Sequence, residues 1–132
     1  MKILALDLSS DCGSLAVLDG EGVLEEKVLD SQHGYADSIF QEIQAALARC
    51  GWGLDQIDGL ACASGPGAFT GVRVGLTVAM SLGEALGKKV VPVSNLRALA
   101  SLGTAELRAP VIDARRGDVF VAVYDRQGTV QQ

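Results

Sequence analysis

The stretch Ser64-Gly-Pro-Gly-Ala-Phe-Thr-Gly-Val-Arg-Val-Gly-Leu76, which continues to Gly87, decides the fold because it joins a glycine turn to a long apolar helix. The turn at 64–67 follows a strand-like run, and its glycines and proline supply the backbone angles that a strand-to-helix connection needs. We expect the helix to begin near Thr70. Small residues then recur at every fourth position and form a stripe along one side of the helix, at Gly71, Gly75, Ala79, Gly83 and Gly87.

Apolar residues cover most of the remaining surface of this helix, so we expect it to be buried on more than one side. One side would face a sheet, and the other would face a second helix of this chain or of another. Arg73 and Glu84 interrupt the apolar segment, which argues against a membrane span. A central core helix without a ligand is the simplest interpretation.

The composition predicts one substantial and mainly aliphatic core, because 48% of the 132 residues are hydrophobic and only 5% are aromatic. The net charge of −5 argues against direct binding to nucleic-acid phosphates, so any contact with RNA would need a basic partner. Cys12, Cys50 and Cys62 are far apart and predict neither a disulfide framework nor a zinc site. Met1 leads directly into a strand without a signal-peptide pattern, and a cytoplasmic location is therefore expected.

The order of the predicted elements is specific. Alternating apolar residues predict an antiparallel meander of three strands, and helices then alternate with strands. The predicted elements are strands at 2–7, 13–18 and 23–29, a helix at 35–50, a strand at 57–63, a helix at 70–86, a strand at 88–93 and a short helix through about residue 102.

The beginning of this order is repeated near the end of the chain. Residues 3–24 match residues 109–130 at a constant offset, which aligns Asp7 with Asp113. The match predicts a duplicated fold. We therefore expect a first domain at 1–106 and the opening strands of a truncated second domain at 107–132, whose sheet would have an exposed edge.

This order is similar to the α/β fold shared by actin, sugar kinases and heat-shock ATPases (the ASKHA fold, ribonuclease H-like), a mixed sheet flanked by helices. Residues 3–11, the glycine block at 64–76 and the stretch Pro110-Val-Ile-Asp-Ala-Arg-Arg-Gly-Asp-Val-Phe120 together resemble the TsaB (YeaZ) family. The resemblance implies a non-catalytic paralogue of TsaD that acts in bacterial synthesis of threonylcarbamoyladenosine (t6A) on transfer RNA. Such sequences are also called glycoproteases.

The residues do not favour a metallopeptidase. The catalytic relative carries two metal-binding histidines four residues apart after the strand that follows the glycine block, and Asn95 and Leu99 stand at the corresponding positions here. Neither side chain can replace an imidazole ligand. The single histidine, His33, has Asp37 one helical turn later, and two ligands do not make a metal site. We expect neither a metal nor another cofactor.

A nucleotide-binding site is a stronger alternative to a non-catalytic role than a metal site is. In the fold that this chain resembles, an aspartate and small residues in the first hairpin of each domain surround the phosphates. The resemblance makes Asp7, Ser9, Ser10 and Asp113 candidates for a vestigial phosphate site. Two arginines at 115–116 follow where close approach to phosphate favours glycine. An ATP-dependent phosphotransferase or ATPase remains the alternative to a non-catalytic subunit.

The resemblance also implies the partners, namely a TsaD-like paralogue and a TsaE-like ATPase in one complex, with tRNA bound only through that complex and no membrane. It further implies a homodimer when the protein is alone, formed through the same two helices that bind TsaD. We therefore predict a contact surface on the first and central helices, where the small-residue stripe permits close approach. The predicted contact residues are Tyr35, Ile39, Ile43, Val72, Gly75, Leu76, Val78, Ala79 and Leu82.

Overall fold

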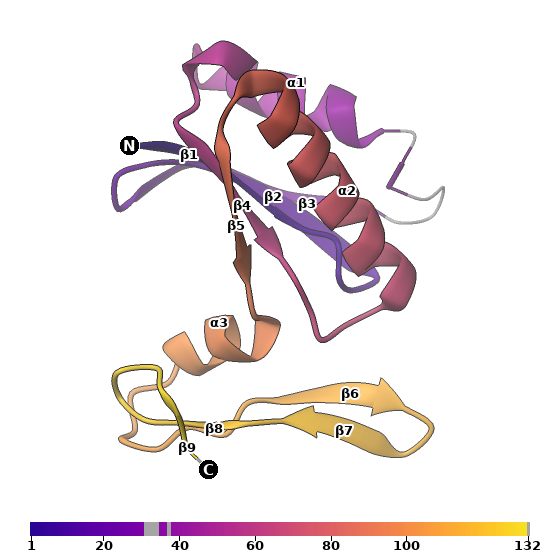
Figure 1. Ribbon diagram of the computed structural model, residues 1–132, viewed down its shortest axis with the longest axis vertical. Helices are drawn as coiled ribbons and strands as arrows, with labels where there is room; N and C mark the ends of the chain where they lie inside the picture. Colours follow the sequence, from indigo (N-terminus) through magenta and orange to yellow (C-terminus); the bar gives the residue numbers. More distant parts are fainter. Residues whose placement is uncertain (31–34, 37, 132) are drawn as a thin grey trace.

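The computed structural model, which describes residues 1–30, 35–36 and 38–131, contains a five-stranded mixed sheet in the order β3-β2-β1-β4-β5 (Figure 1). The first three strands form the predicted antiparallel meander, and β4 and β5 continue the sheet parallel to β1. The strands are β1 (Lys2–Asp7), β2 (Cys12–Asp19), β3 (Gly22–Asp30), β4 (Gly59–Ala63) and β5 (Lys89–Val93).

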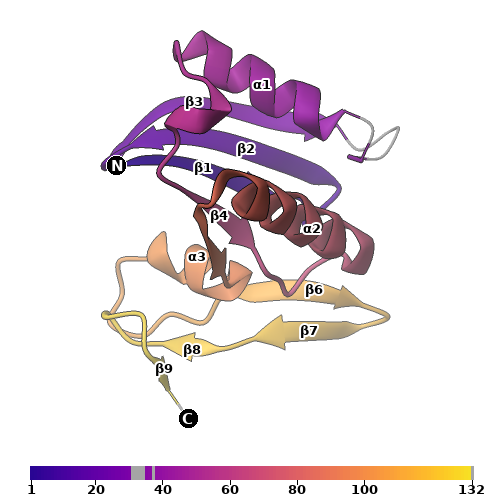
Figure 2. The ribbon, with the colours of Figure 1, turned by 45° about the horizontal axis from the view of Figure 1, so that its top comes forward.

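Two helices cover one face of this sheet, α1 (Ile39–Arg49) and α2 (Phe69–Leu86) (Figure 2). The main core lies between them and the sheet, because Leu4 and Leu6 of β1 point into it together with Ile43 of α1 and Ala79 of α2. A short 3-10 helix (Leu54–Gln56) precedes β4. The first helix begins later than predicted, since Ser38 is its N-cap and residues 35–36 lie in the turn before it.

The small-residue stripe of α2 faces the sheet, not a partner. A Cβ atom at Gly71 would collide with the carbonyl oxygen of Leu8, and one at Gly75 would lie 3.4 Å from the sulfur of Cys62. A Cβ at Gly83 would meet the carbonyl oxygen of Lys88 at 3.0 Å. The predicted close approach is present, but the backbone that approaches belongs to the same chain.

The opposite face of the sheet is built from small side chains. The strand register places Ala5 of β1 between Ala16 of β2 and Ala61 of β4. Asp7 lies on the same face, one pleat further along β1, opposite Ser14. This face is therefore shallow near the carboxyl end of β1, and the helix α3 (Asn95–Ser101) lies near it.

The last part of the chain forms short antiparallel pairs, β6 (Val111–Arg115) with β7 (Asp118–Val121) and β8 (Val123–Tyr124) with β9 (Val130–Gln131). A small second core joins them to α3 and consists of Leu96, Ala100, Tyr124, Ile112 and Ala122. The β6–β7 hairpin agrees with the predicted repeat, whereas the domain limits at 1–106 and 107–132 stay a prediction. None of the described helices is both long enough and apolar enough to span a membrane.

Candidate functional site

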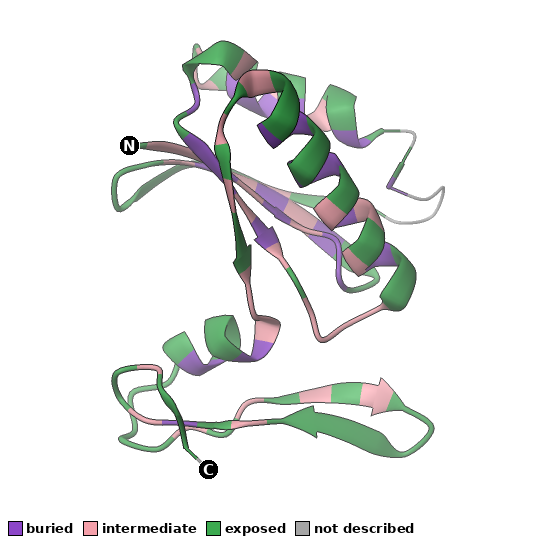
Figure 3. Cartoon of the chain, viewed as in Figure 1, coloured by how far each residue is buried: buried purple, intermediate pink, exposed green. Residues whose placement is uncertain are grey.

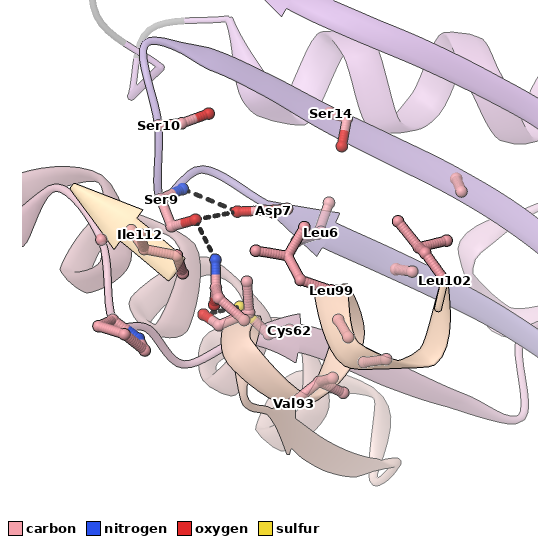
Figure 4. A pocket seen from close by; sticks show the side chains of 18 residues that line it. Leu6, Asp7, Ser9, Ser10, Ser14, Cys62, Val93, Leu99, Leu102 and Ile112 are labelled. Carbon is pink, nitrogen blue, oxygen red and sulfur yellow. Dashed lines mark hydrogen bonds between the residues drawn. The ribbon is translucent and has the colours of Figure 1, made fainter. Parts of the chain in front are cut away.

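A cavity of about 560 Å³ lies between the alanine face of the sheet, α3 and the start of β6 (Figure 4). Its walls are mostly apolar, with Leu6, Val93, Leu99 and Ile112 among the lining residues. Polar side chains gather where β1 ends. They are Asp7, Ser9, Ser10, Ser14 and Asn95.

A hydrogen-bond network connects three of these residues, as the dashed lines in Figure 4 show. The Oδ1 atom of Asp7 accepts bonds from the backbone nitrogen of Ser9 at 2.9 Å and from its hydroxyl at 2.5 Å. The Asn95 side chain donates to that hydroxyl oxygen at 2.5 Å and accepts from the backbone nitrogen of Gly65 at 3.0 Å. The network thereby fastens the end of β1 to the glycine turn and to the start of α3.

A second backbone nitrogen of the first hairpin is also bonded within the chain. The nitrogen of Gly13 donates to the Tyr35 hydroxyl at 2.6 Å, and that hydroxyl donates to the carbonyl oxygen of Ser10 at 2.8 Å. A Cβ atom at position 13 would lie 2.8 Å from the tyrosine ring, so the ring fits because the residue is glycine. A phosphate would have to displace these internal partners to bind the nitrogens of Ser9 and Gly13.

Asp113 is exposed and is not among the residues that line the cavity, whereas its neighbour Ile112 is. Its carboxylate accepts a bond from the backbone nitrogen of Arg115 at 2.7 Å, within its own hairpin. The structure therefore brings Asp7, Ser9 and Ser10 together at the cavity and leaves Asp113 outside it.

The second hairpin turns through left-handed backbone at Arg115 (φ 66°) and Arg116 (φ 57°), a conformation that favours glycine. The guanidinium of Arg115 lies 3.8 Å from the carboxylate of Asp11, in the turn between β1 and β2. The tips of the two hairpins thus face each other, and the ion pair that joins them is exposed.

The cavity does not bring together a metal-ligand set. Asn95 and Leu99 both line it, at the positions where the resemblance places a histidine pair. No group of three or more His, Cys, Asp or Glu side chains suited to a metal occurs among the described residues. His33 and Asp37 lie outside that part of the chain. The sequence did not predict the bonds that join Asn95 to Ser9 and to the glycine turn.

Cys62 is among the residues that line the cavity, but its sulfur lies on the helix side of the sheet near Gly75, in an environment that makes the thiol unreactive. It is 1% exposed, and burial together with the negative charge of Asp7 raises the pKa of Cys62 from 9.0 to about 11. The thiol is therefore protonated at neutral pH, and a protonated thiol is a poor nucleophile.

Most of the predicted contact residues belong to the core. These residues are buried or partly buried within the chain and are not available to a partner, which corrects the prediction at these positions. The buried residues are Tyr35, Ile39, Ile43, Gly75, Val78, Ala79 and Leu82, whereas Val72 and Leu76 are partly buried. The helical period could have distinguished the core residues from the outward residues in the sequence. Each core residue shares its helix face with the small-residue stripe of α2 or with the apolar stripe of α1.

The outward side of α1 and α2 is exposed instead (Figure 3). A groove of about 440 Å³ runs between the two helices and is lined by Phe40, Arg73, Val74 and Thr77, among others. The guanidinium of Arg73 lies over the ring of Phe69, 5.0 Å from its centroid. Large apolar side chains on this side remain uncovered, and Phe69 and Met80 are 74% and 63% exposed.

Known proteins resemble this chain along most of its length. The family model of TsaD, described as tRNA N6-adenosine threonylcarbamoyltransferase, matches residues 23–132. The tRNA threonylcarbamoyladenosine biosynthesis protein TsaB of Haemophilus influenzae is 38% identical, over 96% of this chain and 55% of its own length. The structure of YeaZ from Pseudomonas aeruginosa superposes with a TM-score of 0.83 at 34% identity, over 98% of this chain and 63% of that chain.

A more distant structure shares the fold alone. The activator of 2-hydroxyisocaproyl-CoA dehydratase from Clostridium difficile, solved with bound ADPNP, superposes with a TM-score of 0.61 at 17% identity, over 100% of this chain and 44% of that chain. Together with the YeaZ superposition, this likeness confirms the predicted fold class. The chain spans less than two thirds of the length of these relatives.

Proposed function

Because this chain belongs to the TsaB (YeaZ) branch of the TsaD family, we propose that it is a non-catalytic subunit that binds a TsaD-like partner and supports threonylcarbamoyl transfer to tRNA. The modified base would be the adenosine next to the anticodon, where the product is t6A. The subunit would act as a scaffold or activator, while the partner performs the chemistry.

The observation that carries this proposal is that three polar residues of the cavity, Asp7, Ser9 and Asn95, are bonded to one another. The backbone nitrogens of Ser9 and Gly13 donate to Asp7 and Tyr35, and Asn95 closes the network against the glycine turn. The Cys62 thiol is buried and protonated at neutral pH, so it is a poor nucleophile. This arrangement supports a structural role for a site that binds phosphate in other proteins of the fold.

The exposed side of α1 and α2 supports the docking role. We define the docking face as the outward residues of these two helices, namely Phe40, Phe69, Thr70, Arg73, Thr77, Met80 and Glu84. The exposed Phe40, Phe69, Met80 and Arg73 belong to the residue types that are enriched in protein interfaces. A TsaD-like partner and a second copy of this chain would compete for the same face.

The remaining partners follow from the proposed complex. A TsaE-like ATPase would join the two proteins, and tRNA would be held by the complex because this chain alone has a net charge of −5. Since modification of tRNA takes place where tRNA is made and used, the complex would work in the cytoplasm.

The test is co-purification with the TsaD-like protein of the same organism, together with measurement of t6A in tRNA from cells depleted of their own TsaB. We expect this chain to bind that protein and to restore t6A, and we expect Met80→Glu to lose both effects. Val119→Glu is the matched control, because Val119 is 57% exposed on β7 and lies outside the docking face. Restoration of t6A by Met80→Glu at the wild-type level would contradict the proposed face.

The alternative function, an ATP-dependent phosphotransferase or ATPase, is separated by titration with ATP and magnesium. We expect no binding in the micromolar range, because the backbone nitrogens of Ser9 and Gly13 are already bonded within the chain. Micromolar affinity for ATP that is lost in Asp7→Ala, in a protein that stays folded, would favour the alternative.

A further inference from the structure

The sheet face opposite α1 and α2 forms the floor of the cavity and is only partly covered. Ala16, Ala5 and Ala61 lie side by side on neighbouring strands, and each is partly exposed although β1 is the central strand. Leu4 and Leu15, which belong to the main core on the other face, are fully buried. Because strands lie about 4.8 Å apart, the three methyl groups form a flat apolar floor about 10 Å wide.

One end of this floor carries a negative charge. Asp7 lies one pleat beyond Ala5 on β1, and Ser14 lies directly opposite Asp7 on β2. Among the described residues that line the cavity, Asp7 is the one carboxylate, and none is a lysine, arginine or histidine. The guanidinium of Arg115 lies close to Asp11 instead, and neither of these two residues lines the cavity.

The charged end retains capacity for hydrogen bonds. Both bonds that Asp7 accepts from Ser9 end on Oδ1, and within the described ranges no bond ends on Oδ2. Opposite residues of an antiparallel pair have Cβ atoms about 5 Å apart, so one group can reach both Asp7 and Ser14. A primary ammonium group donates three hydrogen bonds and carries the opposite charge, which suits these two acceptors.

The wall across from the floor is apolar and incompletely covered. Leu99 and Leu102, at the end of α3, line the cavity and are 43% and 80% exposed. Figure 4 shows them around the same space as Asp7 and Ser14. The cavity volume of about 560 Å³ is typical of sites for small molecules. A ligand with an apolar body would therefore remove these leucine side chains from water.

We propose that this cavity binds a small molecule in which a flat apolar ring carries a primary ammonium group on a short chain. The ring lies on the alanine floor beneath Leu99, and the ammonium group lies between Asp7 and Ser14. This binding site is separate from the proposed docking face, since α1 and α2 cover the other side of the sheet.

Charge separates this ligand from a nucleotide. A phosphate at the same end would meet the Asp7 carboxylate without a cation among the described lining residues, and like charges oppose association. The backbone nitrogen of Ser9, which could offset this repulsion, already donates to Asp7. An ammonium group reverses the sign of the interaction and leaves the bonds of Ser9 in place.

The experiment titrates the full 132-residue chain with three indoles that differ in the end group, and follows backbone amides by two-dimensional NMR. The probes are tryptamine, its neutral analogue tryptophol, and the anion indole-3-propionate. We expect tryptamine to bind with a Kd of about 1 mM or tighter, as small probes of this size do. Tryptophol should bind at least about tenfold more weakly, since it lacks the charge, and indole-3-propionate more weakly still. The amides of Ala5, Ala61 and Leu99 should shift with tryptamine, and that of Met80 should not.

Three variants test the two halves of the site. Asp7→Asn keeps an acceptor for Ser9 but removes the charge, so it should raise the tryptamine Kd about tenfold or more and change the tryptophol Kd less than about threefold. Asp113→Asn is the matched control, because Asp113 is exposed outside the cavity lining, and it should leave both values unchanged. Ala61→Leu fills the floor without changing charge, and it should weaken both ligands. The amide spectrum of each variant shows whether it is folded.

Several results would overturn the inference. These are equal affinities for tryptamine and tryptophol, an unchanged tryptamine Kd in folded Asp7→Asn, or no saturable binding of tryptamine up to about 10 mM. ATP that displaces tryptamine would overturn it as well and would favour the phosphotransferase alternative.

The proposed function is tested separately. Met80→Glu alters the docking face and should leave the tryptamine Kd unchanged, whereas a change would place the probe on that face and contradict the cavity. A chain that binds tryptamine as expected but does not bind the TsaD-like protein would keep this inference and refute the proposed function. The reverse pair of results would keep the proposed function alone.

Discussion

Asn95 shows how one side chain can hold three segments together. It follows β5, yet its amide reaches the end of β1 and the turn before α2. Both halves of the amide are used, since the nitrogen donates to Ser9 and the oxygen accepts from Gly65. The position that a metal ligand occupies in the catalytic relative therefore has a structural role here.

Replacement of Asn95 by alanine should lower the free energy of unfolding by about 1–3 kcal/mol, because the partly buried nitrogen of Gly65 would lose its acceptor. Urea unfolding followed by circular dichroism measures the change. Arg97→Ala on the exposed side of the same helix is the control and should stay within about 0.5 kcal/mol of the wild type. Equal effects of the two changes would show that the network contributes nothing.

Cys62 gives the fold a pH dependence in the alkaline range. Its pKa is about 11 in the folded chain, against 9.0 for an unperturbed thiol, so the unfolded chain releases the proton first as pH rises. The stabilisation is complete below about pH 9 and is lost as pH rises toward about 11. The free energy of unfolding of the wild type should therefore fall more steeply over this interval than that of Cys62→Ala, as measured by urea unfolding at several pH values. Parallel curves would contradict the raised pKa.

At the scale of the elements, the sequence predicts the strands and helices well because their periods are strong. The alternation in β1 and β2 and the four-residue spacing in α2 each identify which residues share a face. The period does not say which neighbour that face meets. Gly71 and Gly75 consequently suggest a partner helix in the sequence, but in the fold they pack against Leu8, which follows β1, and Cys62 of β4. The role of Asn95 was not predictable for a related reason, since it depends on segments that are distant in the sequence.

The contact between α2 and β1 makes Gly71 the least replaceable residue of the glycine block. Gly71→Ala should cost more than about 2 kcal/mol of unfolding free energy or prevent folding, because the new methyl group would overlap the Leu8 carbonyl. Thermal unfolding measures the loss. Gly22→Ala is the matched control, since a Cβ there would meet only the carbonyl oxygen of Asp19, at 3.5 Å. A Gly71→Ala protein as stable as this control would show that α2 can move away from the sheet without cost.

The whole molecule contains two hydrophobic cores of unequal size. The main core joins both long helices to the five-stranded sheet, whereas three buried residues, Leu96, Ala100 and Tyr124, form the second core. Arg108 reinforces the smaller part, because its guanidinium donates to the carbonyl oxygens of Ala100 at 2.9 Å and of Asp125 at 3.1 Å. In the β6–β7 hairpin, β7 is exposed throughout, with Val119 and Val121 uncovered, whereas β6 alternates between exposed and partly buried residues.

Amide hydrogen exchange should show that the part of the chain around the smaller core is less protected than the main sheet. We expect amides in the β6–β7 hairpin to exchange at least about 100-fold faster than those in β1 and β4, because opening the hairpin exposes little apolar surface. Mass spectrometry of peptides from the exchanged protein gives the comparison, with the β2–β3 pair as an antiparallel reference inside the main sheet. Equal protection of β7 and β4 would mean that the two parts unfold together.

The Tyr35 hydroxyl has a consequence for how such a protein responds to metabolism. A loop that binds a nucleotide loses hydrogen-bond partners whenever the nucleotide is exchanged or cleaved. The conformation of such a loop therefore depends on the nucleotide concentrations in the cell. Here the loop between β1 and β2 receives its partner from the same polypeptide, at 2.6 Å from Gly13 and 2.8 Å from Ser10. An internal side chain cannot be diluted, hydrolysed or exchanged. We therefore expect the loop to keep the same conformation with and without nucleotide, so that any timing in the proposed assembly would come from the proteins that bind to this chain.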